Sequence, residues 1–136
     1  MLDKQKVQEA LEKNFNNGAY LVTVSFLKKS KNIEIKKEII VKEVETYIKS
    51  IKKMVEIFCW EKQDFKYFYT IAEFKNIYAV SIIINDILDE DKMFSTTFFM
   101  RIKKLRDLEY LGWYLMKDGI KDVKYSKGFF KGINIS

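Results

Sequence analysis

A single apolar stripe runs along residues 35–60, and it limits what the rest of the chain can form. Its members recur at steps of three and four residues, which is the spacing of one face of an α-helix. The opposite face is mostly Lys and Glu, as is typical of a solvent-exposed surface. The stripe therefore predicts a long helix that packs across a large apolar surface. Its residues are Ile40, Val44, Tyr47, Ile51, Val55 and Phe58.

Three stretches predict a sheet that provides this surface. Residues 19–27 alternate between two faces, as a β-strand does. Residues 66–73 and 77–85 are rich in aromatic and β-branched residues, and only residues 74–76 separate them, which predicts a hairpin. We expect an antiparallel sheet with the long helix packed across it. The buried positions of that sheet are then Val22, Val24, Ile82 and Ile84.

The other elements follow from local patterns. Residues 4–14 have helical spacing of apolar side chains, and residues 28–32 form a charged loop. We expect a helix over 92–105, a further helix or its continuation over 106–118, and one or two short strands within 120–136. The order α-β-α-β-β-α-β predicts one α+β domain over 1–136, with an antiparallel sheet of ferredoxin or RRM-like character backed by helices.

Composition excludes several classes of protein. No apolar run approaches the roughly 20 residues that a membrane-spanning helix needs. The first residues are charged and amphipathic, which is unlike a secretory signal. One cysteine, Cys59, cannot form an internal disulfide, and its place at the end of the apolar stripe predicts a small buried residue. We therefore expect a cytoplasmic protein without membrane association.

The net charge of +6 is concentrated near the end of the chain. Residues 100–136 hold nine Lys or Arg against four Asp or Glu, a balance of +5. A basic face of this kind predicts contact with single- or double-stranded nucleic acid, mainly at phosphates, because only two of the 25 basic residues are Arg. A lysine-rich composition that reflects an AT-rich genome is the alternative. The candidate contacts are Arg101, Lys103, Lys104, Arg106, Lys117, Lys124, Lys127 and Lys131.

Two charged segments have structural alternatives. The basic residues of 101–106 are also expected if this segment is the solvent-exposed face of a helix. The apolar face beside it would then hold Phe98, Phe99, Ile102 and Leu105. Four carboxylates within 86–91 suit a divalent metal, yet acidic residues also collect where a helix begins, because they complement its positive end. We expect no metal or cofactor.

Four segments occur in an order that resembles a known family. Glu73 closes one strand of the hairpin, Ala79 and Ser81 share a face of the other, and Tyr110 and Tyr114 lie one helical turn apart. Together with the strand over 20–26 and the basic segment 123–129, this order resembles the rolling-circle replication initiators of phages and plasmids, which have the HUH endonuclease fold. The resemblance implies an assisting Glu, two metal-binding His and a Tyr that attacks a DNA phosphodiester.

This chain departs from that family at the metal site. It contains no histidine, and Ala79 and Ser81 stand where the resemblance implies His-x-His. Ala79 has no donor atom and Ser81 offers one weak neutral oxygen, so we expect no DNA cleavage. Tyr110 and Tyr114 then either pack with Trp113 or stack on a base.

Three functions remain open from the sequence. The first is a catalytically inactive, initiator-like nucleic-acid-binding protein of a phage, plasmid or other mobile element. The second is a small inhibitor of a host defence nuclease, of the anti-CRISPR type, which binds a nucleoprotein effector or its guide RNA. The third is an enzyme with a metal site built from Glu73, Asp86 and Asp89. The sequence leaves the oligomeric state open.

Overall fold

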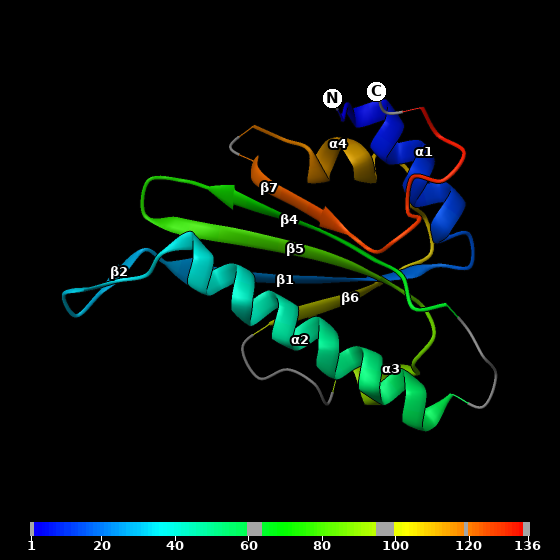
Figure 1. Cartoon of the computed structure of the whole chain (residues 1–136), viewed down its shortest axis with the longest axis horizontal. Helices are drawn as coiled ribbons and strands as arrows, with labels where there is room; N and C mark the ends of the chain where they lie inside the picture. The colour runs from blue at the N-terminus through cyan, green and yellow to red at the C-terminus, as the bar shows by residue number, and fades with distance from the viewer. Residues whose placement is uncertain (1, 60–63, 95–99, 119, 135–136) are drawn as a thin grey trace.

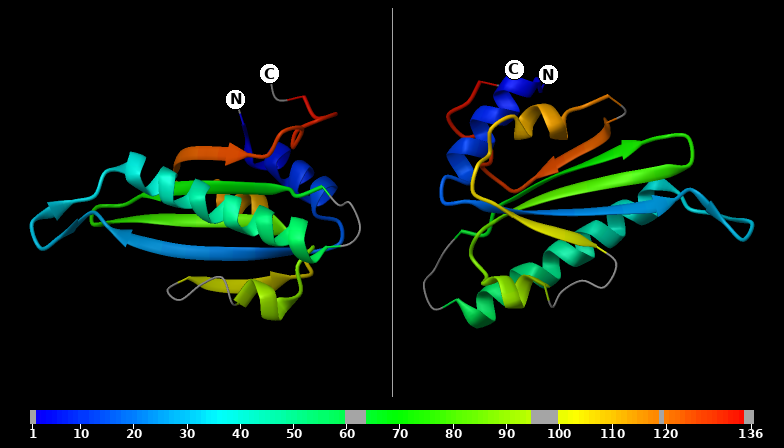
Figure 2. Two further views of the ribbon diagram at one scale, coloured as in Figure 1. Left: turned by 60° about the horizontal axis from the view of Figure 1, so that its bottom comes forward. Right: turned by 180° about the vertical axis from the view of Figure 1, so that it is seen from behind.

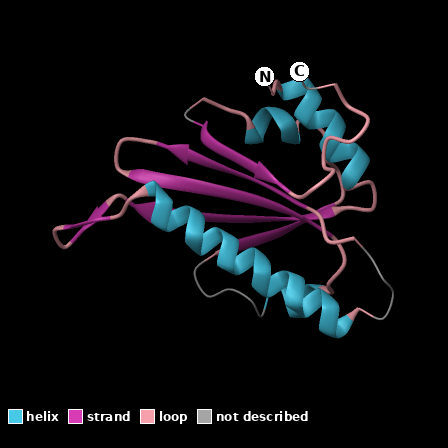
Figure 3. Ribbon diagram, in the orientation of Figure 1, coloured by secondary structure: helices cyan, strands magenta, loops and turns pink. Residues whose placement is uncertain are grey.

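The chain folds around one antiparallel sheet with helices on both faces (Figures 1 and 3). A computed structural model describes residues 2–59, 64–94, 100–118 and 120–134. The predicted α+β class is confirmed. The sheet has the strand order β6-β1-β5-β4-β7. Along the chain the elements are α1 (Lys4–Asn14), β1 (Ala19–Leu27), β2 (Lys29–Ser30), β3 (Ile33–Glu34), α2 (Lys37–Phe58), β4 (Tyr67–Glu73), β5 (Ile77–Asn85), α3 (Glu90–Phe94), β6 (Arg101–Leu105), α4 (Leu111–Leu115) and β7 (Ile120–Tyr125).

Helix α2 crosses one face of the sheet, as its apolar stripe predicts (Figure 1). Val22, Ile82 and Ile84 are buried beneath it, whereas Val24 is only partly buried. Phe58 is an exception to the predicted stripe, because 49% of it is exposed and the Lys92 Nζ lies 5.0 Å from its ring centre. The helix extends past the strands at this end, so its last residue, Phe58, has no described strand to pack on.

Two tyrosine hydroxyls are held within this covered side. The hydroxyl of Tyr69 donates to Glu45 Oε1 at 2.6 Å, and that of Tyr20 donates to the Leu88 carbonyl at 2.8 Å. Burial is the main cause that raises the pKa of both phenols well above the usual value; Glu45 adds to the effect at Tyr69 and Asp86 at Tyr20. Both side chains are therefore neutral hydrogen-bond donors that anchor neighbouring segments to the sheet.

The second face has a smaller cover made of α1, α4 and the residues after β7. Phe15, Phe68 and Phe129 form its centre. Helices α1 and α4 approach closely because Gly112 has no side chain, and a Cβ there would lie 2.8 Å from the Lys4 carbonyl oxygen. The buried Gln8 side chain joins them further, since it accepts from the Gly112 N–H at 2.6 Å.

The helix predicted over 92–105 is wrong. Helix α3 is a short Glu90–Phe94 segment, and β6 pairs antiparallel with β1 along its outer edge. Pairing satisfies the backbone groups of β1 that would otherwise face solvent, and this long-range gain outweighs local helical preference. Phe98 and Phe99 lie outside the described residues. Of the helix predicted over 106–118, only the short α4 forms. It begins after Tyr110, whose backbone has the left-handed conformation with φ of 62°.

The predicted loop 28–32 is instead part of a two-stranded arm. Strands β2 and β3 pair with each other, and the two residues between them, Lys31 and Asn32, both have positive φ. Two such residues form the tight turn that matches strand twist. The arm projects beyond the end of the sheet in every view (Figures 1 and 2).

Cys59 is half-buried at the end of α2, which is less than its predicted burial. Among the residues that the structure describes, no helix combines the length and apolarity needed to cross a bilayer.

Candidate nucleic-acid interface

Among the residues that the structure describes, no helix lies over the part of the sheet face opposite α2 that is remote from α1 and α4 (Figure 2, right). Helices α1 and α4 lie together towards the other part of this face, where their apolar side chains pack on the sheet. We call the uncovered part the open face, and define it by side chains of β1, β5 and β6 that share this side through the strand register. They are Thr23, Ser25, Ala79, Arg101 and Lys103.

The open face combines two exposed positive charges with the small side chains of Thr23, Ser25 and Ala79. Arg101 and Lys103 alternate along β6, so both point to this side, and Thr23 stands directly between Arg101 and Ser81 across the sheet. Both basic side chains are exposed, and neither forms an ion pair with another residue in the described ranges. Their charge is therefore available to an external anion.

Lys104 lies on the opposite side of β6. Its Nζ is 3.3 Å from Asp86 Oδ2 and 3.7 Å from Glu90 Oε1, and it stands over the Tyr20 ring. Strand parity causes this separation, because neighbouring residues on a strand point to opposite faces. Lys104 therefore ties α3 to the sheet, and its expected role beside Arg101 and Lys103 in one basic face is not supported.

The remaining predicted contacts are distributed around the molecule. Strands β6 and β7 are the two outer strands, so Lys124 on β7 is about 19 Å from β6 at the usual strand spacing. Arg106 follows β6 and lines a shallow hollow of about 290 Å³ that also contains Glu12 and Glu109. The eight predicted residues thus do not form one face. Lys117, Lys127 and Lys131 belong to the segments after α4 and β7.

The residues that carry the family resemblance are only partly brought together. Ala79 and Ser81 lie on the side of the sheet on which α4 packs, with Ser81 buried at the inner margin of the open face. Glu73 lies on the other side, opposite Tyr78 in register, and its Oε1 is 3.0 Å from Lys28 Nζ. The predicted trio of Glu73, Ala79 and Ser81 therefore does not share one face.

Helix α4 carries a group of exposed aromatic rings. Tyr110, Trp113 and Tyr114 are 68%, 44% and 42% exposed, and the first two are in edge-to-face contact. Lys117 Nζ lies 4.5 Å from the centre of the Tyr114 ring. These rings are therefore not core residues, and they remain available for stacking beside a positive charge.

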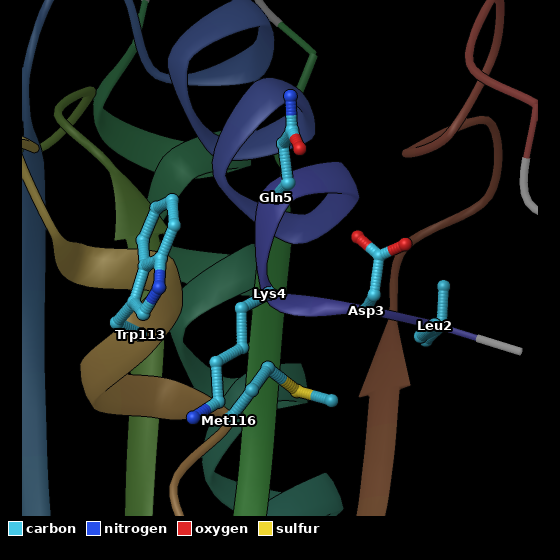
Figure 4. A pocket seen from close by; sticks show the side chains of 6 residues that line it. All are labelled: Leu2, Asp3, Lys4, Gln5, Trp113 and Met116. Carbon is cyan, nitrogen blue, oxygen red and sulfur yellow. The ribbon is translucent and has the colours of Figure 1, made fainter.

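A hollow lies between α4 and the start of α1 (Figure 4). Its volume is about 530 Å³, and Trp113 and Met116 form its apolar side while α1 supplies polar groups. The sequence analysis missed this hollow, because only the fold brings Trp113 beside the N-terminal residues. Its remaining lining residues are Leu2, Asp3, Lys4 and Gln5.

The proposed carboxylate metal site is contradicted. Asp89 caps α3: it accepts from the Lys92 backbone N–H at 2.9 Å and from Lys92 Nζ at 2.7 Å, and the Lys92 side chain lowers the pKa of the Asp89 carboxyl. Asp86 pairs with Lys104, whereas Glu73 ends β4 opposite Tyr78, which is about 23 Å along β5 from Asn85. Within the described ranges, no three metal-ligating side chains come together.

A second basic region was also missed by the sequence analysis. Residues 28–37 hold five Lys against one Glu, a local balance of +4. The five lysines are visible in the sequence, but the acidic residues elsewhere before residue 100 nearly cancel their charge in the net charge of residues 1–99.

These surfaces are what the structure offers for a functional assignment. Comparison of the chain with protein-family models, curated proteins and solved structures finds no match.

Proposed function

We propose that this protein binds nucleic acid through the open face and does not cleave it. The observation that carries the proposal is the pair Arg101 and Lys103, which are exposed, lack ion-pair partners in the described ranges and project from one side of β6. Thr23 lies beside Arg101 and Leu21 beside Lys103, and the small Ser25 and Ala79 continue the same side, so a polynucleotide backbone has steric access to this part of the sheet.

The chemistry of these side chains suits phosphate. A guanidinium group donates two parallel hydrogen bonds to phosphate oxygens, and an ammonium group acts as a mobile point charge. The hydroxyls of Thr23 and Ser25 add donors of the kind that contact the sugar–phosphate backbone. Such contacts position a polynucleotide and contribute little sequence preference, so binding should be broad and sensitive to salt.

We propose no nicking activity, on the basis of the donor atoms. Ala79 and Ser81 provide no imidazole, and Glu73 faces the other side of the sheet. The shared side of Ala79, Ser81 and α4 supports an inactive relative of the rolling-circle initiators, whereas the position of Glu73 argues against a retained metal site.

The test measures binding of labelled single-stranded and duplex oligonucleotides by fluorescence anisotropy over a range of salt concentrations. The double variant R101Q/K103Q should lose at least about tenfold in affinity and reduce the salt slope by about 1.4 on single strands. K52Q/K53Q is the matched control, because both lysines are exposed on the solvent side of α2.

Equal losses in both variants would mean that the charge effect is nonspecific and would overturn the open face as the site. Absence of binding to any oligonucleotide at low salt would favour the inhibitor alternative, in which a nucleoprotein effector is the partner.

A further inference from the structure

We infer that the arm formed by β2 and β3 is a second phosphate-binding element, which contacts the same polynucleotide as the open face. This inference rests on the proposed function and extends its site. The arm, residues 28–35, lies at the end of β1 that is remote from α1 and α4 (Figures 1 and 2).

The arm carries a net positive charge, although Glu34 lies opposite Lys29 in the register of β2 and β3. Lys29 and Lys31 lie on the arm, Lys36 follows it, and Lys75 lies in the turn between β4 and β5 beside its base. All four side chains are exposed, and none forms an ion pair with any residue that the structure describes.

The base of the arm is fixed to the sheet. The Lys28 N–H donates to the Asn76 carbonyl at 3.0 Å, the Ile35 N–H donates to the Lys28 carbonyl at 2.7 Å, and Lys28 Nζ pairs with Glu73 at 3.0 Å. The turn at its tip is tight. The lysines are therefore presented by an ordered element, and less conformational entropy is lost on binding than a flexible loop would lose.

The geometry places the arm in line with the open face. The arm continues the direction of β1 in both views of Figure 2. Thr23, which pairs with Arg101, and Lys31 are eight residues apart, which corresponds to about 26 Å of extended chain. This span equals about eight phosphates of one B-form strand. A polynucleotide that lies along β1 can contact both basic regions, whereas a much shorter one can contact only one.

Two linked contacts make affinity depend on ligand length. Once one region is bound, the second contact is intramolecular and has a high effective concentration. The unmodified protein should therefore gain at least about tenfold in affinity as the oligonucleotide grows from about 4 to about 16 nucleotides.

The experiment compares this length series for the unmodified protein, K29Q/K31Q and the control K52Q/K53Q by fluorescence anisotropy. Gln removes the charge but keeps a polar, unbranched side chain, and it imposes no new demand on the positive φ of Lys31. We expect K29Q/K31Q to bind the shortest oligonucleotide as the unmodified protein does, to lose most of the gain with length, and to lower the salt slope on long single strands by about 1.4. The control should retain the full gain.

The possible failures are distinguishable. If K29Q/K31Q keeps the full gain with length, the arm is not a binding element, although the open face remains one. If the unmodified protein binds no oligonucleotide of any length, the proposed function and this inference are both overturned. Circular dichroism of each variant establishes that its fold is unchanged.

Discussion

The two faces of the sheet use the same strands for different purposes. Towards α2, β1 and β5 present buried Tyr20, Val22 and Ile82. Towards the open face, the middle positions of the same strands are small or polar, such as Thr23, Ser25, Ala79 and Ser81. The side under α2 therefore accounts for much of the apolar burial, and the open face is free to carry charge. The difference teaches that a strand encodes two surfaces, and that its less apolar positions indicate where a ligand has access.

The largest expected difference between the faces is in stability. Ile82→Ala removes a fully buried side chain beneath α2, and it should lower the free energy of unfolding by about 2–5 kcal/mol. Ser25→Ala, on the exposed side of the neighbouring strand, should change it by less than about 0.5 kcal/mol. Urea unfolding of both variants measures the contrast. Similar losses in the two variants would contradict the division into a covered side and an open one.

A smaller effect is expected where α1 and α4 cover the second face. Gly112→Ala places a Cβ within 2.8 Å of the Lys4 carbonyl oxygen and 2.9 Å of the Gln8 nitrogen, and backbone atoms cannot rotate away. The free energy of unfolding should fall by about 1–3 kcal/mol. The exposed neighbour Tyr114→Ala is the control and should have a weaker effect on thermal unfolding. An unchanged melting temperature for Gly112→Ala would show that the two helices are not tightly packed.

The most discriminating comparison uses two adjacent lysines on β6. Lys104→Gln breaks the pairs with Asp86 and Glu90 and should cost up to about 1 kcal/mol of stability, with little change in nucleic-acid affinity. Lys103→Gln should lower the nucleic-acid affinity with little change in stability, because its side chain is exposed on the open face. Unfolding and anisotropy measurements on both variants test this contrast. Equal losses of affinity would mean that both lysines contribute to the same basic face.

Local periodicity made the main elements predictable. The apolar stripe predicted α2, and the short connection at 74–76 predicted the hairpin of β4 and β5. Strand β6 was not predictable, because its five residues have few apolar side chains and their pairing with β1 is a contact across most of the chain. A strand that forms through such long-range pairing leaves little local signal.

The candidate site was predictable in composition but not in geometry. Charge counting found Arg101 and Lys103, yet it placed Lys104 with them, because a helical reading of 101–105 hides the alternation of a strand. It also missed Lys29 and Lys31, because the charge was counted over residues 1–99 together, where acidic residues elsewhere nearly cancel the basic ones.

The charges on the outer strands have a consequence for self-association. Strands β6 and β7 each have one row of backbone groups that no other described strand pairs with. An unprotected edge of this kind recruits strands from other molecules and leads to fibrous aggregates. Here Arg101 and Lys103 lie on one edge, and Asp122 and Lys124 on the other. A second molecule approaching either edge would have to bury charge, so the side chains that we propose as phosphate contacts on β6 also disfavour edge-to-edge growth of the sheet.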